Sequence, residues 1–205
     1  GSSLRPVLRI WKGRFLWRAF LILTLAAVVL AYLAPREETL GQSYKLLYLH
    51  LPLLYTSTLS LILCPALTLM GLRTKRLYNL GPPAALLGIA FGVGSLLAAE
   101  LLAVYAWGGT TTSEPRFVAS MLIYALFVPV YWVGRPRAAA FYALAATALS
   151  LYVYYAVVIS APAPFQLHPS GVEMPLAMKL PLLPATLAAV ALYARLFTVL
   201  EKYWR

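Results

Sequence analysis

The chain has 205 residues, of which 62% are apolar and only 11% charged, and its formal net charge is +11. Soluble domains are roughly 45–50% apolar and about 25% charged. The composition therefore excludes an ordinary soluble domain and predicts an all-α integral membrane protein, because the apolar runs are long enough for helices rather than barrel strands. The basic residues lie between these runs, which indicates topology signals and not a nucleic-acid-binding surface.

The first half of the chain contains three long apolar runs. The first follows a basic segment and is interpreted as a retained helix rather than a cleaved signal peptide, with Gly1-Ser2-Ser3 set aside as a cloning remnant. In the second run, Pro52 and Pro65 are expected to kink the helix. In the third, Ala84, Gly88 and Gly92 recur every four residues, a spacing that permits close helix packing. We predict membrane helices at residues 16–34, 44–72 and 80–105.

The second half contains three further runs, which predict helices at residues 117–133, 138–160 and 181–200. A polar stretch at 106–117 separates the third helix from the fourth. The segment 161–180 is expected to form a loop, since its prolines prevent one continuous helix. Residues 1–205 are thus interpreted as a single six-helix membrane domain without a second domain.

Six spans place alternate loops on opposite sides of a membrane. One side holds both termini and 13 of the 17 lysines and arginines. The positive-inside rule assigns that side to the cytoplasm, so the protein is expected in the inner or plasma membrane of a cell. The loops 35–43, 106–116 and 161–180 are then extracytoplasmic.

His50 and His168 are the only histidines, and both are predicted on the extracytoplasmic side. His50 lies 23 residues before Arg73, which corresponds to roughly 34 Å of helix and places it at the outer interface. Two neutral imidazoles from separate segments can supply both axial ligands of a haem iron. The alternative is a pair of unrelated interfacial histidines. Because His168 lies in a loop, a surface haem-docking site is favoured over an electron path through the membrane.

Three further residues on this side are candidates, each with a simpler alternative. Trp107 could stack on a porphyrin or anchor the helix at the interface. Arg116 could pair with a haem propionate, or be a solvated cation neutralised by Glu114. Glu100 is a functional candidate because an acid near hydrocarbon is costly, although it could instead reach the outer interface.

Three segments resemble a known family, the haem-handling proteins of cytochrome c maturation, of the CcmC type in system I. Residues 44–52, YKLLYLHLP, resemble the segment with the first haem-ligand histidine, which corresponds to His50 and has Tyr48 nearby. Residues 166–171, QLHPSG, resemble the loop with the second, which corresponds to His168. The polar stretch is similar to the tryptophan-rich haem-binding motif of this family, from Trp107 to Arg116 without a gap.

The tryptophan-rich motif is reduced in this chain. The family loop has roughly the pattern WGxWWxWDxR, of which Trp107, Gly108 and Arg116 persist. Glu114 takes the place of the aspartate. The positions where the family has its other tryptophans are occupied by Thr110, Thr111 and Ser113.

The resemblance implies a function in haem delivery. The protein would bind haem b non-covalently and transiently at the outer face and present it to a single-span haem chaperone, with a small one-helix subunit and ABC transporter subunits as further partners. It would not be an enzyme, and membrane lipid rather than nucleic acid would surround it. Two alternatives remain open: a b-type electron-transfer subunit, and a small membrane transporter with Glu100 in a polar pathway.

Overall fold

The computed structural model describes residues 4–37, 40–74, 80–133, 135–160 and 175–203. His168 and most of the predicted loop 161–180 lie outside the described residues. Within the described part the protein is helical, and the only β-type pairing there is an isolated bridge between Glu37 and Gly41. Six of its helical segments are long and apolar enough to cross a membrane, as predicted.

The helices agree with the predicted spans with small shifts at their ends, except that α1 begins at Leu4, twelve residues before the predicted start at residue 16. They are α1 Leu4–Leu33, η1 Ser43–Leu46, α2 Leu47–Gly71, α4 Gly81–Trp107, α5 Pro115–Trp132, α6 Pro136–Val153, the π-helical η2 Tyr154–Ile159, α7 Leu176–Lys179 and α8 Leu182–Tyr203. Helix α1 begins within the basic segment, since arginine, lysine and leucine are good helix formers. Trp107 belongs to the last turn of α4 and not to the loop, because the helix ends at Gly108, whose φ of +66° suits glycine.

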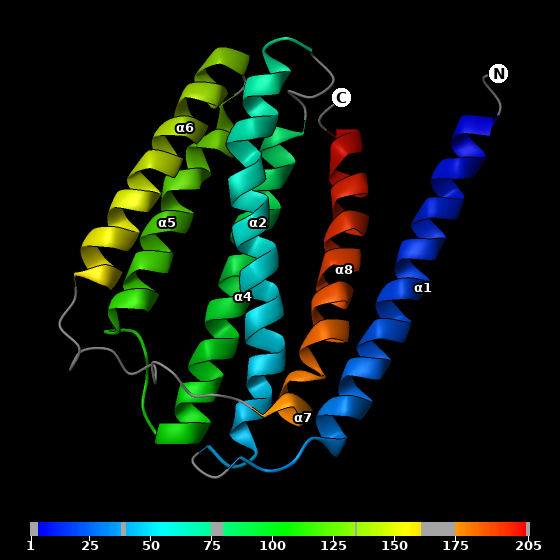
Figure 1. Cartoon of the computed structure of the whole chain (residues 1–205). Helices are drawn as coiled ribbons and strands as arrows, with labels where there is room; N and C mark the ends of the chain where they lie inside the picture. Colours follow the sequence, from blue (N-terminus) through cyan, green and yellow to red (C-terminus); the bar gives the residue numbers. More distant parts are fainter. Residues whose placement is uncertain (1–3, 38–39, 75–79, 134, 161–174, 204–205) are drawn as a thin grey trace.

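Consecutive spans run in opposite directions (Figure 1). The two ends of the chain lie at one end of the bundle, which we call the terminal end. The segments 34–37, 40–46 and 108–114 lie at the other, which we call the loop end, together with α7. The predicted grouping of both termini opposite these loops is therefore present in the structure.

Helices α2 and α4 pack closely at the centre of the bundle. A Cβ atom added at Gly88 would lie 2.5 Å from Leu61 Cδ2, and one at Gly92 would lie 2.2 Å from Tyr124 Cζ. The predicted role of these glycines in close packing is confirmed. Two serine hydroxyls of α2 also donate to α4 carbonyl oxygens, from Ser57 to Gly88 at 2.6 Å and from Ser60 to Ala84 at 2.7 Å. Such bonds join helices where no water is present.

Helices α5 and α6 cover one flank of this pair, and α8 and α1 cover the other (Figure 1). The main apolar cluster joins α2, α4, α5 and α6, with Cys64, Leu96, Tyr124 and Phe127 among its buried members. Helix α1 is the most peripheral span, and only 6% of its apolar window is buried. The closest packing in the described bundle therefore surrounds α2 and α4, and this is where His50 is found.

Candidate functional site

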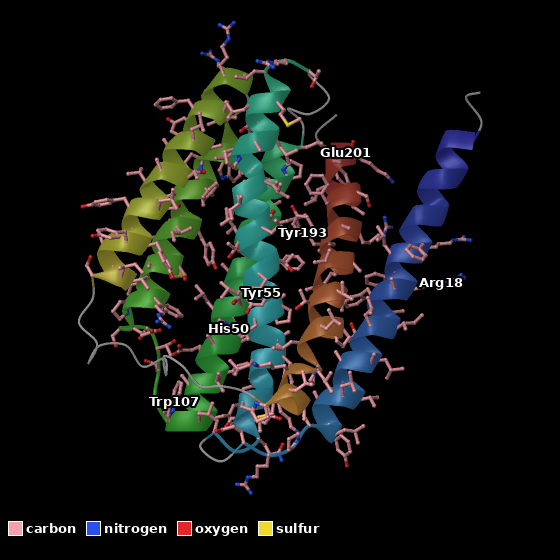
Figure 2. The ribbon with its side chains drawn as sticks, in the orientation of Figure 1. Arg18, His50, Tyr55, Trp107, Tyr193 and Glu201 are labelled. Carbon is pink, nitrogen blue, oxygen red and sulfur yellow. The ribbon has the colours of Figure 1, made fainter. Side chains whose placement is uncertain are left out.

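His50 lies in the first turn of α2 and faces α4 (Figure 2). Its side chain is only 9% exposed. The Nδ1 atom is 2.9 Å from the carbonyl oxygen of Ser95 and 2.9 Å from the Ser95 hydroxyl oxygen. The same hydroxyl donates to the carbonyl oxygen of His50 at 3.1 Å. Helices α2 and α4 are thus joined by a compact group of polar contacts at this level.

The contact with the Ser95 carbonyl oxygen favours one tautomer of the imidazole. A carbonyl oxygen can only accept a hydrogen bond, so the bond between Nδ1 of His50 and the Ser95 carbonyl requires a proton on Nδ1. The neutral ring then carries its lone pair on Nε2. Metal-binding histidines commonly donate one ring N–H to a carbonyl in this way, which orients the ring and leaves the other nitrogen as the ligand.

His50 lies inside the helical bundle, buried against α4. It lies level with Ser95, which is twelve residues before Trp107 at the end of α4. At about 1.5 Å per residue, α4 continues roughly 18 Å beyond this level. The position of His50 was predicted by counting residues to Arg73 along α2 alone. Its burial depends on the neighbouring helix α4, which that count does not include.

A cavity of about 440 Å³ opens beside His50. Its walls come from α2, α4, the segment 108–114, α5 and η2, and its volume is within the range of small-molecule sites. Most of the lining is apolar. The polar side chains in it are those of His50, Tyr55, Ser95, Thr111, Glu114, Arg116, Ser120 and Tyr154.

The segment 108–114 forms one wall of the cavity and is anchored to α4 by Glu100. The Glu100 carboxylate accepts the backbone N–H of Thr111 at 3.0 Å and also the Thr111 hydroxyl. Thr111 is 2% exposed, and its carbonyl oxygen accepts the N–H of Glu114 at 2.8 Å. Glu100 therefore acts through Thr111 on the wall that leads into α5.

Glu114 and Arg116 lie at the start of α5 and both line the cavity. The Glu114 side chain is only 3% exposed, and Arg116 is half-buried. An arginine in the first turn of a helix is disfavoured by the positive end of the helix dipole. Arg116 nevertheless stands at this position, where it brings a positive charge to the wall of the cavity.

The structure brings together three of the predicted site residues and separates the others from them. His50, Glu114 and Arg116 share the cavity. Trp107 is 46% exposed at the loop end and does not line it (Figure 2), and Gly108 caps α4. His168 lies outside the described residues.

Tyr48 has a structural contact of its own. Its buried hydroxyl donates to the Met178 carbonyl oxygen at 2.6 Å. This bond joins α2 to α7 and does not involve the cavity. Tyr48 therefore helps to fix the segment that precedes His50.

Two features of the site were not anticipated from the sequence. Ser95 carried a signal, since it is a hydroxyl residue within an apolar run, and such residues often join membrane helices. The π-helical segment η2, which contributes Tyr154 and Val158 to the cavity, had no distinct sequence signal. Turns of this type often occur at functional sites.

Comparison of the chain with known protein families finds no match, and comparison with curated proteins finds none either.

Proposed function

We propose that this protein is a six-span membrane protein that binds haem in the cavity beside His50 and hands it to a haem chaperone during c-type cytochrome maturation. One observation carries the proposal. His50, with Nδ1 held by the Ser95 carbonyl oxygen at 2.9 Å, lines a cavity of about 440 Å³ that Arg116 also lines. An oriented imidazole and a cation at one apolar cavity suit a flat, apolar, dianionic metal macrocycle.

His50 would hold the haem iron through Nε2. The porphyrin already supplies four nitrogens to the iron, so one protein imidazole is enough to anchor it from one face. The resemblance of the sequence segments suggests His168 as the second axial ligand. The mostly apolar lining of the cavity would exclude water from the bound macrocycle.

Arg116 would pair with a haem propionate. A guanidinium binds a carboxylate through two parallel hydrogen bonds, which orient the ligand as well as attract it. Arg116 is the only lysine or arginine among the described residues that line the cavity. Thr111 and Glu114, held through Glu100, shape the wall beside it.

The distribution of basic residues supports an orientation for this cavity. The topology predicted from the sequence groups 13 of the 17 lysines and arginines on the side of the two termini, so that side would face the cytoplasm. The cavity would then lie in the outer half and open toward the extracytoplasmic side. Single cysteines at positions 74 and 112, in a Cys64→Ala background, test this orientation. In intact cells an impermeant thiol reagent should label position 112 only.

A transfer role implies partners at the outer face. We propose a single-span haem chaperone as acceptor, with a one-helix subunit and ABC transporter subunits completing the assembly. The protein itself would bind and release haem without bond chemistry. Its affinity must therefore be sufficient for capture but low enough for transfer.

A pyridine haemochrome assay of the purified protein tests the proposal. The parent protein should retain haem, and His50→Ala should lose most of it. Tyr48→Phe is the matched control, because it removes a buried polar contact of α2 outside the cavity. Equal haem content in the parent and in His50→Ala would refute the site. Reversible reduction of the haem by quinol would instead indicate an electron-transfer subunit, and haem-free protein with saturable solute uptake would indicate a transporter.

A further inference from the structure

A second cavity, of about 520 Å³, lies between α1 and α8 toward the terminal end of the bundle. Three cations line it: Arg14 from α1, and Arg195 and Lys202 from α8. Apolar groups form the rest of its surface, principally Trp17 and Leu196. We call it the α1–α8 groove. It is separate from the cavity beside His50, with which it shares no lining residue.

Gly13 makes room for this groove. A Cβ atom at Gly13 would lie 3.2 Å from Nη1 of Arg195, so the guanidinium lies directly over the backbone of α1. The Arg195 guanidinium makes a single hydrogen bond to a described side chain, from Nη1 to Thr198 Oγ1, and at 3.4 Å this bond is long. Among the described residues, no carboxylate forms an ion pair with Arg14, Arg195 or Lys202. The groove therefore brings three positive charges together.

The position of the groove corresponds to the boundary between lipid headgroups and hydrocarbon. Gly13 is the first residue of the first apolar span, and the last span ends at Tyr203. Trp17, which is 48% exposed, lies at the depth where tryptophan is favoured in membranes. Cations above apolar walls at this depth complement an amphiphile with a negatively charged head.

We infer that the α1–α8 groove binds one anionic phospholipid, such as phosphatidylglycerol, from the leaflet at the terminal end. The phosphate would contact Arg14, Arg195 and Lys202, and an acyl chain would lie along Leu196 and Trp17. Basic pockets between membrane helices are known to hold such headgroups. The lipid would tie α1 to α8, the helix against which α1 packs (Figure 1). This inference rests on the proposed membrane embedding and not on the haem site.

Quenching of Trp17 by brominated lipid tests the inference. The protein is reconstituted into phosphatidylcholine vesicles with increasing fractions of phosphatidylglycerol brominated on its acyl chains. The Trp17 signal is the difference in fluorescence between the parent and Trp17→Phe. The mole fraction of brominated phosphatidylglycerol that gives half-maximal quenching should be at least fivefold lower than the fraction of brominated phosphatidylcholine that does so. Arg14→Gln and Arg195→Gln should each raise that fraction about fivefold.

Arg18→Gln is the matched control, because Arg18 is an exposed cation of α1 that does not line the groove. It should leave the quenching curve unchanged. Gly13→Leu, which fills the groove without changing a charge, should abolish the preference for the anionic lipid, and circular dichroism shows whether each variant is folded. Equal quenching by both lipids would overturn the inference. Loss of the quenching on addition of millimolar glycerol phosphate would also overturn it, because the groove would then be a site for soluble anions. So would cross-linking of two copies of the chain through this groove.

Discussion

The Nδ1 atom of His50 lies 2.9 Å from the carbonyl oxygen of Ser95, and the Ser95 hydroxyl donates back to the carbonyl oxygen of His50 at 3.1 Å. The two residues are 45 positions apart in the chain. Their reciprocal bonds fix α2 against α4 and orient the imidazole at the same time. Because the acceptor for Nδ1 is a backbone atom, the orientation does not depend on the serine side chain.

This relationship predicts a small effect of Ser95→Ala. The variant loses the hydroxyl bond to His50 but keeps the carbonyl acceptor, so haem should still bind with the parent absorption spectrum. The free energy of unfolding should fall by about 0.6 kcal/mol, a typical value for a side-chain hydrogen bond between membrane helices. Ser57→Ala, which removes a similar bond to the Gly88 carbonyl oxygen, is the control for stability. A changed spectrum in Ser95→Ala alone would show that the hydroxyl orients the ring.

Glu100 is expected to act as a positioning residue. Glu100→Ala removes the acceptor for the Thr111 N–H, so hydrogen exchange of that amide should accelerate about tenfold, as expected for loss of ~1.5 kcal/mol. Haem affinity should fall with it, because Thr111 and Glu114 form a wall of the cavity. Thr110→Val, which removes an exposed hydroxyl bonded to Thr112, should change neither quantity. Unchanged exchange at Thr111 in Glu100→Ala would contradict the anchoring role.

Arg116 can be tested with a modified ligand. Haem dimethyl ester lacks ionised propionates, so the parent protein should bind it more weakly than haem, by roughly 1.5–3 kcal/mol for a charge-assisted bond. In Arg116→Gln the two ligands should bind equally. Fluorescence quenching titrations give both affinities. If the difference between haem and its ester persists in Arg116→Gln, another residue binds the propionates.

The packing of α4 against α5 predicts the effect of Gly92→Ala. The added Cβ would lie 2.2 Å from Tyr124 Cζ, so the ring must move, at a cost of about 1–3 kcal/mol. Gly94→Ala is the control, since its Cβ would make an ordinary 3.4 Å contact with Leu53. Cys64 is the only cysteine and is fully buried, so its rate of thiol labelling during heating reports unfolding. Identical labelling curves for the two variants would contradict the packing described here.

Much of the fold could be predicted because the length and composition of an apolar run are local properties. The six spans, the polar break after α4 and the grouping of both termini at one end followed from them. The same reasoning identified Glu114 and Arg116 as polar residues beside a helix mouth. These two residues line the cavity.

The rest depends on contacts between distant segments. The burial of His50 comes from its contact with Ser95 of α4, and a count of residues along α2 cannot show that contact. The bond from Thr111 to Glu100 gives a structural role to a position where the resemblance suggested a tryptophan. Helix α4 continues to Trp107 because the left-handed turn comes only at Gly108. Trp107 is therefore part of this helix, and its indole does not line the cavity.

Replacement of the His50 imidazole by a free one tests the central claim most directly. With His50 and His168 as the two axial ligands, the haem-loaded protein should have a low-spin spectrum. His50→Gly should lose that spectrum while keeping its helical content. Millimolar imidazole should enter the vacated space, ligate the iron and restore that spectrum. Ser57→Gly, measured in parallel, should need no imidazole. A low-spin spectrum in His50→Gly without imidazole, or no restoration when imidazole is added, would show that His50 does not ligate haem.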